Sequence, residues 1–295
     1  MKTTLFLTAM LVLAVFIAPL SLHAQDTASD STGLDGDHFS LEGALAFFKK
    51  AESLEDFEKM LNKENNEVNN LDLNEDGDVD YIRVVDHMEG DVHAIVLQVP
   101  VNSSESQDVA VIELEKDGPE SAILQIIGDE DLYGEPKIAE PFEEETTKTN
   151  GRNGPAMGNM PVRIVVNVWL WPSVRFVYRP AYRVYVSPWR WGVYPTWYRP
   201  FRPRPWGVYR VGIRPYRAHY TVVSTRRVVR ARPVYAPHRA HATVVHTRTT
   251  TKVKGPRGGT VKRTTNTTTV RGKHGGVKKQ KTTTVKAHKG GRGRH

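Results

Sequence analysis

The sequence predicts an α+β fold in which two N-terminal helices pack on a small antiparallel meander of about four strands, followed by an extended, largely disordered basic region. Apolar residues recur at helical spacing near the N-terminus and then alternate with period two in the segments that follow. All 33 acidic residues lie between Asp26 and Glu145, whereas residues 146–295 contain 33 Lys or Arg and no acid. This segregation favours an acidic domain joined to a basic region over a single compact domain, because each half of such a domain would repel itself.

The N-terminus has the pattern of a secretory signal peptide. Lys2 precedes an apolar run from Leu5 to Leu20, and Ala24 supplies a small residue before an expected cleavage at Gln25. The run is shorter than the roughly 20 residues that a membrane-spanning helix needs. We therefore expect residues 1–24 to be removed, leaving an exported protein without a transmembrane segment in the periplasm, on the outer cell surface or in the extracellular space.

The acidic domain is expected over residues 38–145, after a polar linker at 25–37. Ser40 and Ser53 can cap two helices with buried apolar stripes. Segments rich in Val and Ile then predict four strands, at residues 81–88, 92–99, 108–115 and 122–127. Their short connections favour antiparallel neighbours, and the helices can cover one face of the resulting sheet.

An acidic loop between the helices and the first strand predicts a calcium site. Oxygen-bearing side chains occupy alternate positions around Gly77, and calcium takes about 6–8 oxygen ligands. We expect Asp78 to bind through its carbonyl and the others through side chains, so that a structural ion fixes the turn. The alternative is a solvated turn in which these side chains bond their own backbone. The predicted metal ligands are Asp72, Asn74, Asp76, Asp78 and Asp80.

The string from Asp72 to Tyr81 resembles the D-x-[DN]-x-D-G calcium loops of EF-hands, dockerins and integrin-type propeller repeats. It departs from the EF-hand where Arg83 stands in place of the final bidentate carboxylate. An acid at the ninth position followed by a strand is closer to the propeller-repeat loop. The resemblance covers about ten residues, and it implies a metal loop without implying a whole fold.

The basic half begins with a Gly, Asn and Pro hinge at residues 146–161. Residues 162–237 interleave aromatic residues, arginine and proline so densely that we expect an extended or polyproline-like segment. Residues 238–295 repeat Thr, Lys and Gly with almost no aliphatic residues, which predicts a disordered cationic tail.

Arginine binds phosphate, sulfate and carboxylate, and Trp offers flat faces on which sugars or bases stack. The interleaved segment therefore predicts a surface for polyanions, and self-association through arginine stacking on the chain's own aromatic rings is the alternative. The residues predicted to contact a polyanion are Arg175, Arg179, Arg183, Trp189, Arg190, Trp191, Trp197, Arg199, Arg202, Arg204 and Trp206.

Several classes of function are disfavoured. The chain has no cysteine, so it has no disulfide, no thiol nucleophile and no thiolate metal site. It contains no phosphate-binding glycine loop and no H-E-x-x-H or G-x-S-x-G motif.

The whole chain resembles exported proteins of Gram-negative bacteria that pair a D-x-N-x-D-G-x-x-D-Y-I domain with a basic, aromatic C-terminal region, and no activity follows from that resemblance. We predict a non-enzymatic envelope or surface protein whose acidic domain holds one calcium ion. Its basic arm is expected to adhere to lipopolysaccharide, acidic polysaccharide or extracellular DNA. The alternatives are a structural protein that assembles head to tail, and an enzyme acting on envelope polymers.

Overall fold

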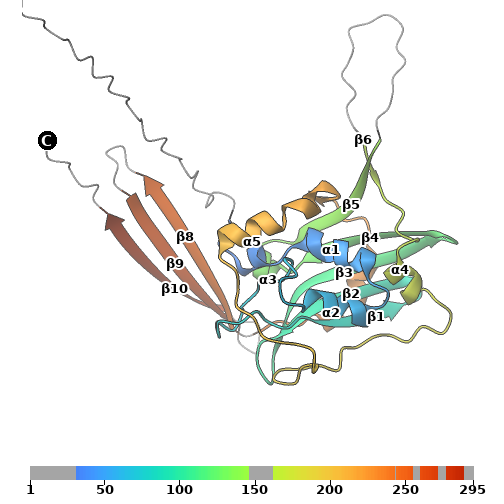
Figure 1. Cartoon of the computed structure of the whole chain (residues 1–295), viewed down its shortest axis with the longest axis horizontal. Helices are drawn as coiled ribbons and strands as arrows, with labels where there is room; N and C mark the ends of the chain where they lie inside the picture. Colours follow the sequence, from blue (N-terminus) through green and yellow to red (C-terminus); the bar gives the residue numbers. More distant parts are fainter. Residues whose placement is uncertain (1–30, 146–161, 243, 255–259, 272–276, 289–295) are drawn as a thin grey trace, which may run out of the picture.

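The computed structural model describes residues 31–145, 162–242, 244–254, 260–271 and 277–288. The predicted signal peptide and the predicted hinge lie outside these residues. Among the residues described, no helix combines the length and the apolar character needed to cross a membrane. The main body is one sheet with helices on both faces, and a second, smaller sheet follows it in the chain (Figure 1).

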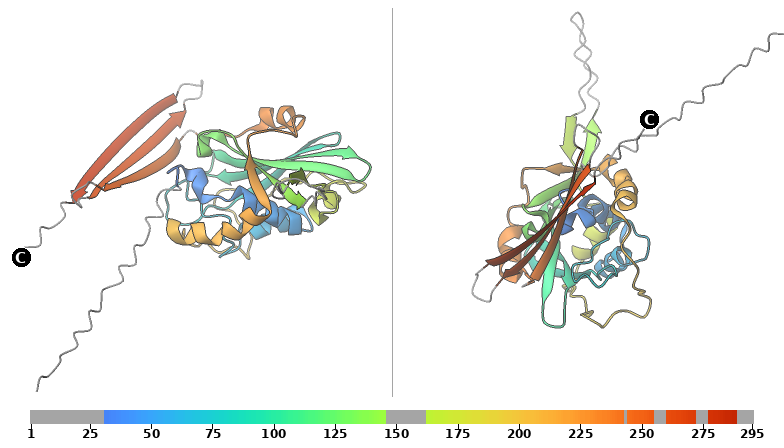
Figure 2. Two further views of the ribbon diagram at one scale, coloured as in Figure 1. Left: turned by 90° about the horizontal axis from the view of Figure 1, so that it is seen from above. Right: turned by 90° about the vertical axis from the view of Figure 1, so that its left-hand side faces the viewer.

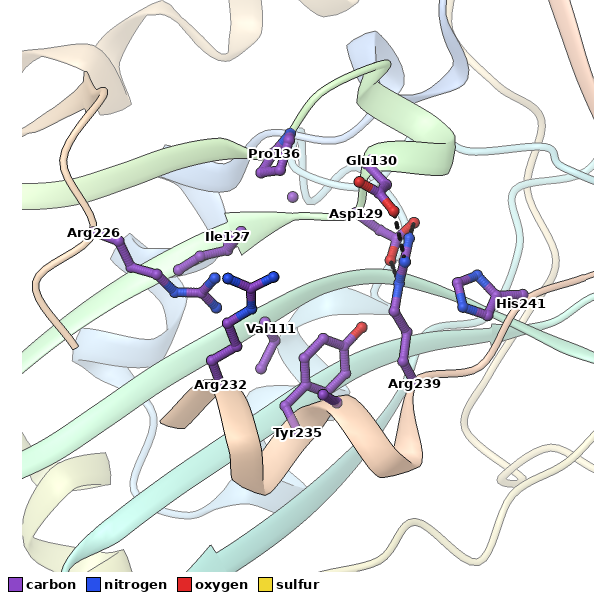
Figure 3. A pocket seen from close by; sticks show the side chains of 12 residues that line it. Val111, Ile127, Asp129, Glu130, Pro136, Arg226, Arg232, Tyr235, Arg239 and His241 are labelled. Atoms are coloured by element: carbon purple, nitrogen blue, oxygen red, sulfur yellow. Dashed lines mark hydrogen bonds and ion pairs between the residues drawn. The ribbon is translucent and has the colours of Figure 1, made fainter. Parts of the chain in front are cut away.

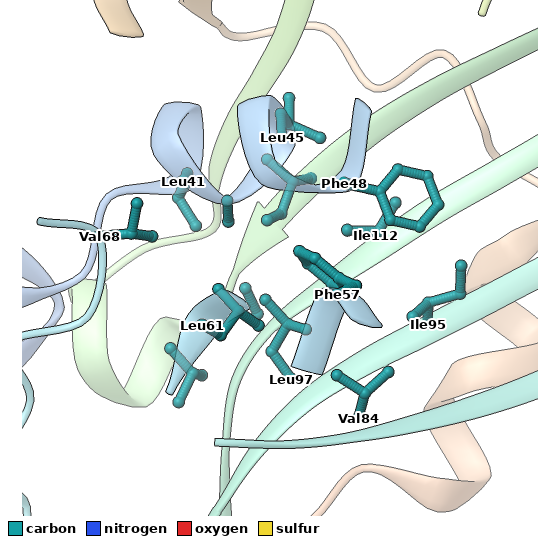
Figure 4. Close-up of a cluster of buried hydrophobic side chains, with 14 of the residues drawn as sticks. Leu41, Leu45, Phe48, Phe57, Leu61, Val68, Val84, Ile95, Leu97 and Ile112 are labelled. Carbon is teal, nitrogen blue, oxygen red and sulfur yellow. The ribbon is translucent and has the colours of Figure 1, made fainter. Parts of the chain in front are cut away.

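The N-terminal helices begin at the expected serines. Ser40 Oγ accepts a hydrogen bond from the Gly43 amide at the start of α1 (Leu41–Lys50). Ser53 Oγ accepts one from the Asp56 amide at the start of α2 (Leu54–Leu61). These side chains satisfy amides that have no partner within the helix. The buried stripes of both helices then face the sheet (Figure 4).

The main sheet has seven antiparallel strands. Strands β1 to β5 are neighbours in sequence order, and β5 pairs with both β6 and β7 along different parts of its length. Ile138 of β5 stands opposite Val223 of β7, whereas Phe142 of β5 stands opposite Val165 of β6. The strands are β1 (Arg83–Glu89), β2 (Val92–Pro100), β3 (Ser106–Gly118), β4 (Ser121–Gly128), β5 (Lys137–Glu145), β6 (Val162–Val165) and β7 (Tyr220–Val223).

The predicted fold class is therefore wrong in the size of the sheet. Four strands occur where alternation predicts them, but three more extend the sheet, and two of these come from the basic half. Strand β5 ends in a run of glutamates, so its sequence lacks the alternation of apolar residues that predicts the other strands. It pairs with a strand of the basic half, so that Glu144 stands opposite Arg163 in register.

The prediction of an extended, largely disordered basic region is also wrong. Residues 162–242 fold over both faces and one edge of the acidic sheet (Figures 1 and 2). Their helices are short: α4 (Pro172–Val177), α5 (Trp206–Gly212), η3 (Arg214–Ala218), α6 (Ala231–Tyr235) and η4 (Ala236–His238). Proline does not prevent α4, because Pro172 occupies its first turn, where no intrahelical donor is lost.

The two faces of the sheet carry separate cores. On one face, α1 and α2 pack on the sheet together with buried residues of the basic half, including Trp171, Val174 and Val177. On the other face, Tyr235 of α6 packs on a smaller cluster that includes Val96 and Val111. Figure 2 shows α6 and α1 on opposite sides of the sheet. The basic half thus completes both cores.

Residues 172–204, called the strap from here on, run from α4 along the outer edge of β1. The Asp86 amide donates to the Tyr185 carbonyl at 2.8 Å, and the Ser187 amide donates to the Val84 carbonyl at 2.9 Å. These bonds cover an edge strand that would otherwise present unpaired backbone groups. The acidic and basic halves therefore share one sheet and its edge.

The C-terminal residues form a separate three-stranded antiparallel sheet instead of the predicted disordered tail. Its strands are β8 (Val244–Lys254), β9 (Thr260–Arg271) and β10 (Val277–His288), with β9 in the centre. The threonine repeats lie in register, since Thr265 pairs with both Thr249 and Thr283. Threonine is β-branched and favours strands, which is the physical reason for this departure.

Candidate functional site

The predicted calcium loop is a tight turn whose side chains accept hydrogen bonds from its own backbone. Asn74 Oδ1 accepts from the Asp76 amide, and Asp76 Oδ1 accepts from the Asp78 amide, both at 2.9 Å. Asp72 Oδ2 accepts from the Gly77 amide at 3.1 Å. Gly77 has a φ of +91°, which glycine adopts without strain. Hydrogen bonds from a turn's backbone to its own acidic side chains are what the alternative to a calcium loop, a solvated turn, predicts.

Two carboxylates behind this turn are largely buried. Asp80 is 7% exposed, and its Oδ2 accepts from the Leu73 amide at 2.5 Å. Burial, followed by the charges of Asp72 and other nearby acids, raises the pKa of Asp80 to about 8. Burial and the charges of Glu75 and Asp72 raise the pKa of Asp35 to about 7. Both groups resist carrying a negative charge here without a cation.

Asp35 was not identified from the sequence, which placed it in a polar linker. It begins the short helix η2 (Asp35–His38), where Gly36 packs so closely that a Cβ would lie 2.7 Å from the Tyr133 ring. Asp35 Oδ2 and Asp72 Oδ1 are buried oxygens without a hydrogen-bond partner among the described residues. Nothing in the sequence distinguishes Asp35 from its acidic neighbours, because its burial depends on chain packing far from it in sequence.

The residues around this turn fit a hard cation in their chemistry. The donor set is made of carboxylates and one amide oxygen, the ligands that calcium prefers. Two buried carboxylate oxygens have no donor to satisfy them, which carries a cost that a bound cation would remove. These carboxylates are not among the described groups whose ligand atoms lie within 4.8 Å of one another, so they would have to come closer together around an ion. The residues that could then hold it through side chains are Asp35, Asp72, Asn74, Asp76 and Asp80.

A second group of side chains that could bind a metal lies where α3 (Glu130–Tyr133) meets the segment between η4 and β8. Asp129, Asp131 and His241 present ligand atoms within 4.8 Å of one another, so they could hold a metal ion. Arg239 already contacts this group, donating to both oxygens of Asp129 at 2.6 and 2.7 Å and to Glu130 at 2.8 Å. The guanidinium neutralises the carboxylates, and a metal ion would have to displace it.

The predicted polyanion-binding arginines are divided by the fold. Arg204 is half-buried and bonded to Glu67 at 2.8 Å, so it holds the strap to the acidic half. The other predicted arginines are exposed, and among the residues that the structure describes none of them forms an ion pair. They follow the strap in chain order: Arg175, Arg179, Arg183, Arg190, Arg199 and Arg202.

The predicted tryptophans are divided in the same way. Trp197 lies 6.5 Å from the Tyr81 ring, and Lys59 lies over it at 5.8 Å. Trp206 packs edge-on against His38 at 5.5 Å. Contacts with rings and a cation of the same chain thus account for these two tryptophans without a ligand. Within the described residues, Trp189 and Trp191 are half-buried and have no ring partner.

Arginines of the second part of the basic half bind acids of the sheet. Glu113 of β3 is fully buried and pairs with Arg226, whose Nε donates to it at 2.9 Å. Arg227 donates to Glu140 of β5 at 3.0 Å, and Arg230 donates to Glu115 at 2.8 Å. Together with the bonds of Arg204 and Arg239 to acids outside the strands, these contacts attach residues 204–239 to the acidic half.

Comparison with protein-family models, curated proteins and solved structures finds no match for this chain. The function is therefore argued from the residues and their geometry.

Proposed function

We propose that this protein is exported and binds polyanions, without enzymatic activity, through the exposed arginines of the strap. The observation that supports this is the uneven distribution of arginine. Arginines 204–239 include those that bind acids of the sheet, whereas the six between Arg175 and Arg202 are exposed without an ion pair in the described structure. Guanidinium groups without an acidic partner keep their charge available for phosphate, sulfate or carboxylate.

The strap offers ring-stacking surface beside that charge. Trp189 and Trp191 flank the exposed Arg190, and neither ring has an aromatic partner among described residues. A polymer that carries both anionic groups and sugar rings or bases meets both kinds of contact. The strands of the C-terminal sheet add ten Lys or Arg and no acid to the same chain. An acidic envelope polysaccharide, lipopolysaccharide or extracellular DNA has the matching chemistry.

The experiment measures heparin affinity of the mature chain across a salt series. Log Kd should rise linearly with log salt because binding releases counterions. Arg183→Gln with Arg190→Gln should lower that slope by about 1.5, because each phosphate-like contact accounts for roughly 0.7–0.9 of it. The same two substitutions in a chain that ends at Ala242 should lower the slope equally, which separates the strap from the C-terminal sheet.

The matched control removes two exposed charges from the acidic half, by Lys50→Gln with Lys63→Gln. It has the same net charge as the strap variant and should bind heparin like the unchanged protein. If the two double variants lose affinity equally, net charge alone drives binding and the strap is not the site.

We further propose that the turn at 72–80 binds one calcium ion, with Asp35 as a ligand from outside the loop. The unpartnered buried oxygens of Asp35 and Asp72 support this. A native-state ligand raises the free energy of unfolding by RT ln(1 + [L]/Kd), which is about 2.7 kcal/mol at a hundredfold excess. The ion would stiffen the junction between α2 and β1.

Thermal unfolding in calcium and in chelator tests the ion directly. Calcium should raise the unfolding midpoint of the unchanged protein, and Asp76→Ala should abolish that rise. Asp35→Asn should reduce it, whereas Asp117→Asn, at the exposed end of β3, should leave it unchanged. Equal midpoints in calcium and chelator, with no binding heat, would exclude the ion.

A further inference from the structure

A cavity of about 320 Å³ lies on the α6 face of the main sheet, away from α1 and α2 (Figure 3). Its floor is apolar, formed by Val111 of β3 and Ile127 of β4, and Pro136 lies at one side. Tyr235 of α6 forms part of the opposite wall. The volume and the mixture of an apolar floor with a few charged groups are typical of small-molecule sites.

Three arginines line the cavity, and two of them are neutralised by acids. Arg239 binds Asp129 and Glu130. Arg226 binds the buried Glu113 through two of its nitrogens. The pair of Arg226 and Glu113 leaves no net charge on its side of the cavity, whereas Arg239 faces two carboxylates, so the opposite side is net acidic.

The third arginine is the one with unused donors. Arg232 is exposed at the rim of the cavity, and its side chain makes no hydrogen bond or ion pair with a described residue. Figure 3 shows its guanidinium beside that of Arg226, between Ile127 and Val111. Arg226 and Arg232 together face one carboxylate, that of Glu113, so one positive charge is uncompensated.

We propose that this cavity binds a small monocarboxylate with a flat apolar body, such as an aromatic acid. The carboxylate binds Arg232, beside the guanidinium of Arg226, and the body covers the apolar floor under Tyr235. Guanidinium groups favour bidentate, charge-assisted hydrogen bonds to carboxylates. The one positive charge left beside Arg226 matches one ligand carboxylate, and the acidic groups around Arg239 disfavour a ligand with further negative charges. This distinguishes the ligand from the polyanions proposed for the strap.

The test titrates the mature chain with para-fluorobenzoate and follows fluorine NMR. Saturable binding in the millimolar range or tighter is expected. Arg232→Gln should raise the Kd about tenfold, which corresponds to about 1.4 kcal/mol. This is close to the lower end of what a hydrogen bond to a charged group contributes. Ala236→Phe, which places a bulky group at an exposed residue of the cavity wall, should abolish it. The neutral para-fluorobenzamide should bind weakly or not at all.

The matched control is Arg175→Gln, which removes an exposed arginine of the strap. It should leave para-fluorobenzoate binding unchanged while it weakens heparin binding, so the two proposals fail independently. Three results would overturn the cavity proposal: no saturable binding by the unchanged protein, equal affinity for acid and amide, or equal losses in Arg232→Gln and Arg175→Gln.

Discussion

Residues 162–242 and residues 244–288 are both basic and both lack acids, yet their strands belong to different sheets. The first segment merges with the acidic sheet and completes its two cores. The second forms a sheet of its own. The excess negative charge of the acidic half would attract both segments, so charge attraction alone cannot explain the difference.

The difference follows from apolar content. The first segment contributes large buried side chains, among them Trp171, Tyr209, Tyr220 and Tyr235, which are all at most 8% exposed. Each buries apolar area that stabilises the fold by about 25 cal/mol per Å². The second segment consists mainly of Thr, Lys and Val and offers far less of that area. Apolar burial therefore places a basic segment on the acidic sheet, and ion pairs then fix its position.

The largest expected effect of a single substitution concerns the buried pair that joins the halves. Arg226→Met leaves the carboxylate of Glu113 buried without its partner, and Glu113 is fully buried. We expect a loss of about 3–5 kcal/mol in the free energy of unfolding, measured by urea denaturation. Adding Glu113→Gln should restore most of it. A loss below about 1 kcal/mol would mean that this pair does not hold the halves together.

A second effect concerns Glu58, which joins α2, β1 and the strap. Its carboxylate accepts from the Val84 amide at 2.7 Å, the Tyr81 hydroxyl at 2.8 Å and the Ser187 hydroxyl at 3.0 Å. Glu58→Ala leaves these donors unsatisfied and should cost about 2–4 kcal/mol. Ser187→Ala removes one of two strap contacts with Glu58, since the Tyr185 hydroxyl also donates to this carboxylate at 3.4 Å, and should cost about 1 kcal/mol. Equal costs would mean that the bond from Ser187 accounts for the whole effect of Glu58.

Stability without calcium should depend on pH through the acids behind the turn. The pKa of Asp35 is raised to about 7 and that of Asp80 to about 8, both well above their unfolded values. The folded chain then binds more protons, so its stability is full below about pH 4 and falls as pH rises through 7 to 8. Thermal unfolding in chelator at pH 5 and pH 8 measures the fall. Asp35→Asn should reduce it, and a midpoint that rises with pH would contradict the buried acids.

The smallest effect is expected at an exposed pair of the same interface. The Arg230 side chain is 60% exposed and bonds Glu115 at 2.8 Å. Exposed ion pairs contribute about 0–1 kcal/mol, so Arg230→Gln should hardly change the urea midpoint. A loss as large as that of Arg226→Met would show that charge attraction, and not burial, attaches the basic half.

Local signals predict the local parts of this fold. Ser40 and Ser53 begin their helices because a cap needs only a nearby amide, and the alternation of Val and Ile locates four strands. The segregation of charge favours an acidic domain joined to a basic region, and it also marks complementary partners. Arg226 and Arg239 bond acids that lie more than 100 residues away in the sequence.

The rest depends on contacts that no short window contains. Asp35 lies in η2, where its neighbour Gly36 packs against the ring of Tyr133, almost 100 residues away in the sequence. Pro172 begins a helix whose Val174 and Val177 are buried in the core. The loop from Asp72 to Asp80 forms the turn that its spacing predicts. That it holds calcium stays a prediction.

The central claim is that the acidic segment is completed by the basic one. Urea unfolding of three chains tests it: residues 31–145, residues 31–242, and residues 25–295. We predict that residues 31–145 unfold without a cooperative transition, because both faces of the sheet lose buried partners such as Trp171 and Tyr235. The two longer chains should share one cooperative midpoint. Cooperative unfolding of residues 31–145 at that same midpoint would contradict the account.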